Sequence, residues 1–332
     1  HVVVGTPGRV LKHLAKGSLD LSRLKSLVLD EADRMLDMGF HDSIAEVVSQ
    51  MPAQRQTLLF SATYSKEVRA MSTRFQRDPV SVTVADTPEA IKITQIFHEV
   101  DNRERVNAVA AILRHHKPET AVLFCNTKQR CDEVVTELAG KGFQVAALHG
   151  DLEQRDRDLV LVKFSNRSCP ILVATDVAAR GLDIKDLAMV INVEMAFDPE
   201  VHVHRIGRTG RAGQSGLAVS LCAPADGHRV LAVEDYQSIK VDWQDLPVAT
   251  GASSTVLPRM VTLNIAGGRK DKVRPGDILG ALTGDAGIPG AMVGKIDIFD
   301  MQAYVAVDRD VANQAIKGLG KIKGRIFRVR KV

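Results

Sequence analysis

The fold of this chain is decided by five short apolar runs, which read LKSLVLD (residues 24–30), TLLFSAT (57–63), AVLFCNT (121–127), ILVAT (171–175) and MVINV (189–193). Longer amphipathic stretches separate them, at residues 44–51, 67–75 and 131–138. Apolar strands that alternate with amphipathic helices are typical of a parallel β-sheet with crossover helices on both faces. The sequence therefore predicts the α/β class.

Two segments interrupt this alternation and indicate domain boundaries. Residues 78–90 (DPVSVTVADTPEA) contain two prolines among small polar residues, and residues 244–258 (QDLPVATGASSTVLP) are rich in Pro, Gly, Ser and Thr. Such compositions are common in linkers. We expect three units, at residues 1–86, 91–240 and 257–332.

The last unit has a different order of elements. It reads MVTLNI (260–265), PGDILGALTG (275–284), KIDIF (295–299), AYVAV (303–307), VANQAIKGL (311–319) and GRIFRVRKV (324–332). This is strand, helix, strand, strand, helix, strand, the split βαβ or ferredoxin-like arrangement, with a final strand expected over residues 324–332. Many unrelated proteins share that order, so it says little about function by itself.

Composition and charge narrow the class of protein. The 332 residues include no apolar run of the roughly 18 residues that a membrane span needs, and the four cysteines form no CxxC pair. We expect no membrane partner and a reducing compartment, the cytoplasm. The net charge of +4 is uneven, because residues 257–332 carry 14 Lys and Arg against seven Asp and no Glu. A phosphate-bearing partner would be attracted to this basic tail, although a solvated basic face is an equally open interpretation.

Carboxylates follow the first apolar run directly, in LVLDEAD (residues 27–33). Ligands of open α/β sheets collect at the carboxyl ends of strands, where Asp30 and Glu31 fall. An aspartate there can hold Mg²⁺, directly or through water, and a neighbouring glutamate can deprotonate an attacking water. Acidic residues also favour helix N-termini, so a purely structural role stays open.

A rarer pattern is HRIGRTGR (residues 204–211). In a helix it would place His204, Arg208 and Arg211 on one face, where two guanidiniums could meet one phosphate. Gly207 and Gly210 are poor helix formers, and their presence suggests that another backbone or a nucleotide comes close. The alternative is a basic surface turn.

Together these motifs resemble the DEAD-box ATP-dependent RNA helicases. DEAD (30–33), SAT (61–63), ATDVAARGLDI (174–184) and HRIGRTGR (204–211) occur in that family's order, with TPGR (6–9), FCNT (124–127), HGD (149–151) and QRDR (154–157) as further matches over residues 1 to about 235. The basic split βαβ tail makes the chain most similar to the DbpA subgroup of bacterial helicases.

The resemblance implies two RecA-like lobes, the first incomplete, that close on ATP and RNA. Asp30 and Glu31 would hold Mg²⁺ through water, with Glu31 also activating the attacking water. Arg208 and Arg211 would be arginine fingers that contact the nucleotide, and Asp183 would hold its ribose. A further set would couple nucleotide state to lobe closure: Asp33, Ser61, Thr63 and His204. The hydroxyls of Ser61 and Thr63 could instead cap the following helix.

The resemblance also implies a grip on the sugar-phosphate backbone of one RNA strand, which positions the strand without reading its sequence. The residues concerned are Thr6, Gly8, Arg9, Thr127, Gly150, Arg157, Thr175, Asp176 and Arg180.

Sequence specificity then has to come from the RRM-like tail. RNA-recognition sheets stack bases on aromatic side chains, but here Gln302 and Thr262 stand where rings are usual and only Tyr304 remains. We therefore expect recognition of a structured RNA through basic loops and edges. The residues are Arg269, Lys270, Lys272, Arg274, Lys317, Lys321, Lys323 and Arg325, with a contribution from Tyr304. In the DbpA subgroup a similar domain anchors the enzyme to a hairpin of 23S ribosomal RNA, and the motor acts on neighbouring duplexes during assembly of the large ribosomal subunit.

The chain departs from the family in one respect. The phosphate loop GxxxxGK[ST], which cradles the phosphates of ATP, does not occur in it; the nearest string, GAMVGK (290–295), lies in the tail with the wrong spacing. We expect this polypeptide to be the remainder of a complete enzyme, and by itself to bind ATP poorly and not to fold its first lobe unaided. Two other functions stay open: an rRNA-bound clamp without turnover, and a DNA helicase. A redox function of Cys125 or Cys131 is not favoured, because these two cysteines do not have the paired CxxC spacing.

Overall fold

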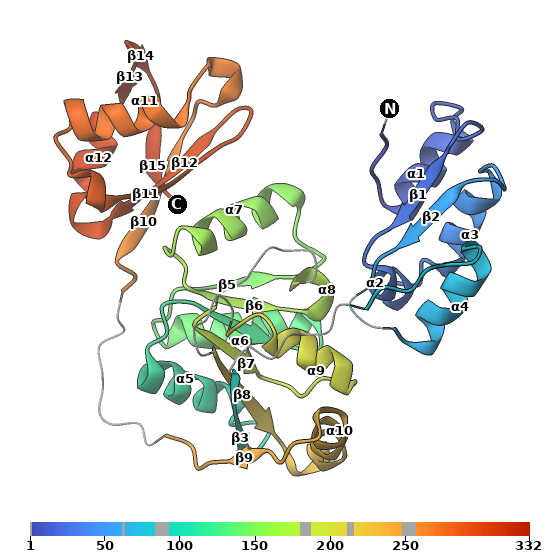
Figure 1. Cartoon of the computed structure of the whole chain (residues 1–332). Coiled ribbons are helices and arrows are strands. Elements are labelled where there is room, and N and C mark those ends of the chain that lie inside the picture. The colour runs from blue at the N-terminus through green and yellow to red at the C-terminus, as the bar shows by residue number, and fades with distance from the viewer. Residues whose placement is uncertain (1, 62–63, 84–92, 180–186, 211–215, 248–256) are drawn as a thin grey trace. The chain divides into compact units, whose positions relative to one another are not determined.

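The computed structural model describes residues 2–61, 64–83, 93–179, 187–210, 216–247 and 257–332. The chain divides into two compact units, residues 1–86 and 87–332 (Figure 1). Helices and parallel strands alternate along most of it, which confirms the predicted α/β class. Within the described residues, no helix combines the length and apolarity that crossing a membrane requires.

The first unit contains a small parallel sheet. Strand β1 (Ser26–Leu29) pairs with β2 (Gln56–Leu59) in parallel, with Leu29 opposite Leu59. The helices are α1 (Pro7–Ala15), α2 (Ala32–Asp37), α3 (His41–Ser49) and α4 (Lys66–Phe75). Side chains of a strand alternate between its faces, so Leu29 is buried with Ala32, Ile44 and Met71 while Val28 is 52% exposed. The sheet is therefore covered on one face within this unit.

The second unit is built on a seven-stranded, all-parallel sheet. Its strands are β3 (Ile93–Glu99), β4 (Ala121–Phe124), β5 (Val145–Leu148), β6 (Ile171–Ala174), β7 (Met189–Asn192), β8 (Gly216–Cys222) and β9 (Asp242–Trp243). They lie in the order β5-β6-β4-β7-β8-β3-β9. The central strands are buried on both faces, as near-continuous apolar runs such as AVLF predict.

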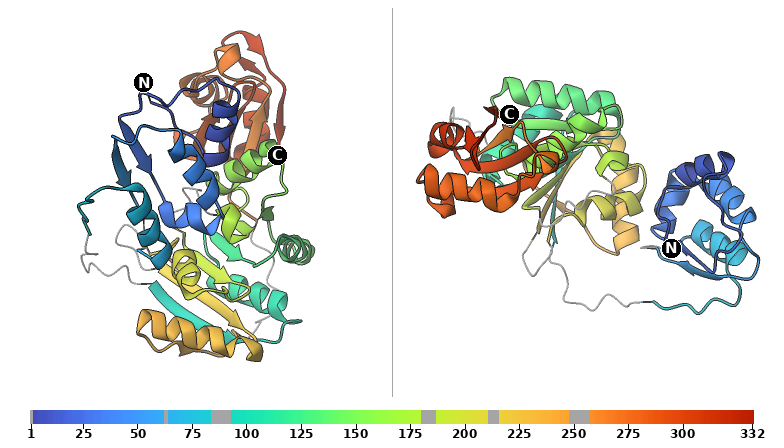
Figure 2. Two further views of the ribbon diagram at one scale, coloured as in Figure 1. Left: turned by 90° about the vertical axis from the view of Figure 1, so that its right-hand side faces the viewer. Right: turned by 90° about the horizontal axis from the view of Figure 1, so that it is seen from above.

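Helices cover both faces of this sheet (Figures 1 and 2). Leu123 of β4 packs with α5 (Arg105–His116) and α6 (Lys128–Gly140). Its neighbour Phe124 faces the opposite way, toward α7 (Gln154–Ser165) and α8 (Asp176–Ala179). Helices α9 (Pro199–Ile206) and α10 (Gly227–Gln237), the latter preceded by a 3₁₀ turn (Pro224–Asp226), complete the unit's parallel-sheet part.

The C-terminal part, residues 257–332, is an antiparallel sheet with its own core. The strand order is β11-β12-β10-β15, formed by β10 (Met260–Ile265), β11 (Val293–Ile298), β12 (Ala303–Asp308) and β15 (Val329–Lys331). Helices α11 (Pro275–Gly280), continued by a π-turn (Ala281–Asp285), and α12 (Ala312–Gly318) cover one face. This is the split βαβ arrangement that the order of elements predicted.

The predicted final strand, residues 324–332, is wrong at its start. Residues 321–326 form a separate hairpin of β13 (Lys321–Ile322) and β14 (Arg325–Ile326), and the sheet strand begins only at Val329. The two-residue turn consists of Lys323 and Gly324, with φ of 50° and 78°. Two positive φ angles define the tight turn that matches the twist of a hairpin, and glycine makes the second one free of strain.

Candidate functional site

The two predicted carboxylates lie at the carboxyl end of β1 and are exposed. Asp30 Oδ1 accepts a hydrogen bond from the backbone N–H of Glu31 at 3.0 Å. Glu31 has a left-handed backbone (φ 52°, ψ 53°) at the N-cap of α2, and its carboxylate forms an ion pair with Arg34 one turn later. A left-handed non-glycine residue costs about 1–2 kcal/mol, and such strain is concentrated at functional sites. The strand end thus presents two carboxylates to solvent on a strained turn.

The DEAD and SAT motifs are joined by hydrogen bonds. The N–H of Asp33 donates to Ser61 Oγ at 3.3 Å, and the N–H of Ala32 donates to the Phe60 carbonyl at 2.9 Å. Ser61 therefore does not cap the following helix; Ser65 does, by accepting from the N–H of Val68. This hydrogen bond directly connects Ser61 with Asp33, two residues that we expect to couple nucleotide state to lobe closure. Thr63 lies outside the described residues.

The TPGR motif forms the N-terminus of α1. Thr6 is the extended N-cap residue, and its carbonyl accepts from the N–H groups of Arg9 and Val10 at 3.0 Å. Thr6, Gly8 and Arg9 are exposed, and a Cβ added to Gly8 would meet nothing within 4 Å. Exposed N–H groups and an arginine at a helix N-terminus suit a phosphate, as the resemblance implies.

In the second unit a buried arginine that sequence reasoning missed organises the site. Arg205 of α9 has a 1% exposed side chain and grips Asp176 through Nε–Oδ1 (2.6 Å) and Nη2–Oδ2 (2.8 Å). It also donates to Asn126 Oδ1 at 2.8 Å and to the Glu194 carbonyl at 2.8 Å, above the ring of Phe124. One guanidinium thus joins the carboxyl ends of β4, β6 and β7 to α9. The only feature of the sequence that could have indicated this role is the position of Arg205 inside HRIGR (204–208).

One of the two predicted arginine fingers, Arg208, lies beside this network. A shallow pocket is lined by His204 and Arg208 together with Phe124, Asp176, Ala179, Val201 and Arg205. Arg208 follows the last turn of α9, and its carbonyl accepts from the N–H of Leu187 at 3.2 Å. Arg211, Asp183 and Arg180 lie outside the described residues.

The close backbone approach expected at Gly210 is present. Gly210 has a φ of 75°, and a Cβ added to Gly216, the first residue of β8, would lie 2.4 Å from the Gly210 nitrogen. The neighbour is therefore another backbone segment of the same unit. Only glycines allow the end of the motif to pack against β8 in this way.

The residues expected to grip RNA in this unit differ in what their side chains already do. Thr127 and Gly150 are exposed, but Thr127 Oγ1 caps α6 by accepting from the N–H of Arg130 at 3.1 Å. Arg157 donates to the Ala178 carbonyl at 3.0 Å. Thr175 is 9% exposed. The Asp176 carboxylate is paired with Arg205 and so supports α9, while its expected RNA contact stays a prediction.

Buried titratable groups flank the network, and burial shifts their pKa values toward the neutral form. Burial lowers the pKa of His202, on α9, to about 4, with the nearby Arg205 charge as a second cause. The pKa of the Cys125 thiol is raised by its hydrogen bond with Cys131 and by burial. The four cysteines are free and buried. A protonated, buried thiol is inert, which argues against redox function.

The C-terminal part brings the two predicted basic clusters together on one edge. Arg325 of the β13–β14 hairpin donates to the Asp271 carbonyl at 3.2 Å, and Lys323 forms an ion pair with Asp277 at 2.8 Å. These contacts place the hairpin against the loop of Arg269, Lys270, Lys272 and Arg274, all exposed. We call these residues, 269–274 and 321–325, the basic edge. Lys317 is exposed on α12.

The face of the antiparallel sheet that the helices leave uncovered does not offer an exposed stacking platform. Tyr304 is 4% exposed and packs edge-on against Phe299, with ring centroids 5.7 Å apart. Thr262 on the same face bonds to Asn166 and Ser168 at 3.1 and 2.6 Å. The ring of Tyr304 is therefore used for packing in this structure, and its RNA contact stays a prediction.

Comparison with known proteins agrees with this geometry. The DEAD/DEAH box helicase family matches residues 1–71, the helicase conserved C-terminal domain residues 104–213, and the DbpA RNA binding domain residues 262–331. The ATP-dependent RNA helicase DbpA of Escherichia coli is 52% identical over 332 residues, covering 99% of this chain and 72% of that protein. DbpA of Bacillus subtilis is 32% identical, covering 100% of this chain and 74% of that protein.

Other relatives share the motor part. The DEAD-box ATP-dependent RNA helicase CshA of Geobacillus kaustophilus is 44% identical over 227 residues, which are 68% of this chain and 49% of that protein. Among solved structures, S. cerevisiae Dbp5 bound to RNA and ADP BeF3 aligns with a TM-score of 0.67 and 29% identity, over 74% of this chain and 66% of that one. The chain belongs to the DEAD-box ATP-dependent RNA helicases, and it carries their two helicase domains followed by a DbpA RNA-binding domain.

Proposed function

We propose that this protein uses ATP hydrolysis to separate short RNA duplexes next to a structured RNA that its C-terminal domain holds. The observation that carries the proposal is the Arg205 network, which fixes α9 and its motif at the carboxyl edge of the seven-stranded sheet. Preorganised arginines stabilise the charge that develops on a transferred phosphate, and such a group is worth about 10³ to 10⁵ in rate. The residues for this task are Arg208 and Arg211.

Asp30 and Glu31 fit the other half of the reaction. Both carboxylates are exposed at a strand end, and carboxylate and water oxygens are the ligands that Mg²⁺ prefers. When bound, Mg²⁺ neutralises charge on the phosphates. Glu31 would orient and deprotonate the attacking water once its carboxylate leaves Arg34. Asp183 would hold the ribose, and the hydrogen bond between Ser61 and Asp33 would transmit nucleotide state.

We propose that the RNA held by the C-terminal domain is a hairpin of 23S rRNA and that the protein acts in large-subunit assembly, in the cytoplasm. The basic edge supports a phosphate-rich partner, the buried Tyr304 argues against single-strand stacking, and the match to the DbpA RNA binding domain supports the class of RNA. The four free cysteines support a reducing compartment.

RNA-stimulated phosphate release tests the proposal. It is measured on a protein that also carries the phosphate loop GxxxxGK[ST], because these 332 residues do not contain that loop. We expect 23S rRNA fragments to raise turnover, chelation of Mg²⁺ to abolish it, and Glu31→Gln to lower it by about 10²–10⁴ while RNA affinity is unchanged. Retention of turnover by Glu31→Gln would reject the assigned base. Binding without turnover in the wild type would instead indicate an RNA clamp.

A second arm compares duplexes of equal sequence made of RNA and DNA. The 2′-hydroxyl distinguishes them, and we expect separation of the RNA duplex alone. Equal separation of both would reject the choice of RNA over DNA.

A further inference from the structure

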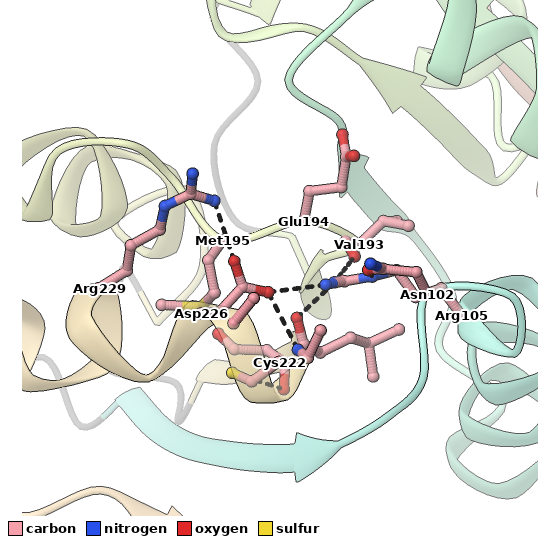
Figure 3. Close-up of polar contacts among 12 residues, drawn as sticks. Asn102, Arg105, Val193, Glu194, Met195, Cys222, Asp226 and Arg229 are labelled. Carbon is pink, nitrogen blue, oxygen red and sulfur yellow. Dashed lines mark hydrogen bonds and ion pairs between the residues drawn. The ribbon is translucent and has the colours of Figure 1, made fainter.

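A second buried arginine binds the connection that leads into α9 (Figure 3). Arg105, at the start of α5, has a side chain that is 5% exposed. Its guanidinium donates four hydrogen bonds: Nε to Asn102 Oδ1 (2.8 Å), Nη1 to the carbonyls of Val193 (2.5 Å) and Leu221 (2.6 Å), and Nη2 to Asp226 Oδ2 (2.7 Å). The motor motifs do not include it.

Asp226 is held as firmly as its partner. Oδ2 also accepts from the N–H of Ala223 at 3.0 Å, and Oδ1 accepts from Arg229 Nη1 at 2.9 Å. Arg229 in turn lies over the ring of Phe197, 4.6 Å from its centroid, in the connection between β7 and α9. Figure 3 shows this chain of contacts from Arg105 through Asp226 to Arg229.

Three successive carbonyls at the end of β7 are each bound by a different side chain. Val193 O accepts from Arg105, Glu194 O from Arg205, and Met195 O from Asn126 Nδ2 at 3.0 Å. Buried carbonyls that leave a sheet need such partners. Arg105 and Arg205 therefore hold neighbouring residues of one short connection.

This connection determines where α9 begins. It runs from Val193 to Asp198, whose side chain caps α9 by accepting from the N–H of Glu200 at 2.8 Å. Arg105 also binds the Leu221 carbonyl near the end of β8, the strand that begins against Gly210. The same guanidinium thus contacts the strand before α9 and the strand after its motif.

We propose that Arg105 and Asp226 form a positioning pair that holds the β7–α9 connection, and with it the arginine-bearing motif, at the carboxyl edge of the sheet. The proposal rests on the proposed function, because it assigns the pair to the placement of Arg208. Arg105 is a positioning residue: it acts through Val193 and Leu221 and not on the nucleotide. The Asp226 carboxylate compensates for the buried positive charge of Arg105 and orients its guanidinium group.

The test compares Arg105→Met and Asp226→Asn with Arg114→Met in the protein that also carries the phosphate loop. Arg114 lies on the same helix, and its guanidinium contacts the ring of Phe143 at 5.2 Å from the centroid. Arg105→Lys is the conservative variant: it keeps the charge opposite Asp226 but donates from a single atom, so it provides a folded protein if the other two do not fold.

Hydrogen exchange of residues 193–206 is the first measurement, and it needs no ATP. We expect exchange about tenfold faster in Arg105→Met and Asp226→Asn, an intermediate rate in Arg105→Lys, and wild-type exchange across residues 128–148 in every variant. Unchanged hydrogen exchange at residues 193–206 would contradict the proposal that Arg105 and Asp226 hold the β7–α9 connection. Exchange that is equally faster at residues 193–206 and 128–148 would contradict it too.

The second measurement is the split between kcat and KM for RNA in ATP hydrolysis. Misplacement of a transition-state group by about 1 Å can cost about 100-fold, so we expect kcat per folded molecule to fall at least about tenfold with the KM for RNA within about twofold of wild type. A loss of stability alone would leave kcat per folded molecule unchanged, and that result would overturn the positioning role. Absence of hydrolysis in the wild-type protein that carries the phosphate loop would reject the helicase proposal, while hydrogen exchange would still decide whether Arg105 and Asp226 hold the connection.

Discussion

Arg205 holds Asp176 by two parallel hydrogen bonds, Nε to Oδ1 at 2.6 Å and Nη2 to Oδ2 at 2.8 Å, although the two residues are 29 positions apart. This fork-to-fork pairing fixes both the position and the plane of the guanidinium. Because Arg205 is 2% exposed, little water surrounds its charge, and the carboxylate of Asp176 compensates for the lost hydration.

We therefore expect Asp176→Asn to lower the free energy of unfolding by about 3–5 kcal/mol, since it leaves a buried guanidinium without its carboxylate. Urea unfolding of the full chain measures this. The matched control is Glu119→Gln, whose partner Arg167 lies at 2.7 Å with both side chains mostly exposed. That change should cost about 1 kcal/mol or less. Equal costs for the two variants would contradict the importance of the buried pair.

His202 should make the second unit sensitive to acid. Burial, followed by the Arg205 charge, lowers its pKa from 6.5 to about 4. Between these two pH values the unfolded chain binds a proton that the folded chain does not, so stability falls as pH drops through this window and is constant above it. The effect is on the order of 3 kcal/mol.

Unfolding by urea at pH 7, 5.5 and 4.5 checks this expectation. His202→Gln keeps a donor for Gln95, which His202 contacts at 3.2 Å, and removes the titrating ring. The variant should lose much of the decline between pH 7 and 4.5. An undiminished decline would assign the acid sensitivity to other groups.

The basic edge should supply phosphate contacts. Arg325→Gln should weaken binding to 23S rRNA fragments and reduce the slope of log K against log salt by about 1, because one fewer counterion is released. Arg309→Gln is the control: this exposed arginine also donates to one backbone carbonyl, that of Pro258 at 2.8 Å, and it lies at the opposite end of the sheet strands. Filter binding at several salt concentrations should separate the two. If Arg325→Gln and Arg309→Gln had the same slope of log K against log salt, Arg325 would not contact the RNA.

Gly268 should tolerate no side chain. An added Cβ would lie 2.2 Å from the Phe299 carbonyl oxygen and 2.6 Å from that of Asp300, and these backbone atoms cannot give way cheaply. We expect Gly268→Ala to destabilise the C-terminal part by about 1–3 kcal/mol and to displace Arg269, whose N–H donates to the same Phe299 carbonyl at 2.8 Å. Gly276→Ala in α11 meets nothing within 4 Å and should be neutral or slightly stabilising. Thermal unfolding distinguishes the two variants.

The sequence was sufficient for the layers of the fold and for the family. Apolar runs such as AVLF and ILVA became buried parallel strands because a strand covered on both faces must be apolar throughout. The DEAD and SAT motifs, whose Asp33 and Ser61 the resemblance placed in one coupling set, lie together. Such features can be predicted from local sequence patterns alone, without knowing which distant residues they contact.

The supporting residues could not be found in the same way. The sequence does not distinguish a buried arginine from an exposed one. The role of Arg105 becomes apparent only from its contact with Asp226, 121 residues away. The final strand was predicted too early because Lys323 gives no sign of a positive φ, so the hairpin was missed. Tyr304 was expected to be available because a pattern of strand residues does not show what packs over them.

The left-handed backbone of Glu31 has a consequence for selection experiments. Glycine or asparagine adopts φ 52° with less strain, so we expect replacement of Glu31 by either to relax the turn and raise the melting temperature while it removes the proposed general base. A library screened for heat resistance alone would therefore be enriched in inactive protein at this position, and thermotolerance and turnover should be scored together in any directed evolution of this enzyme.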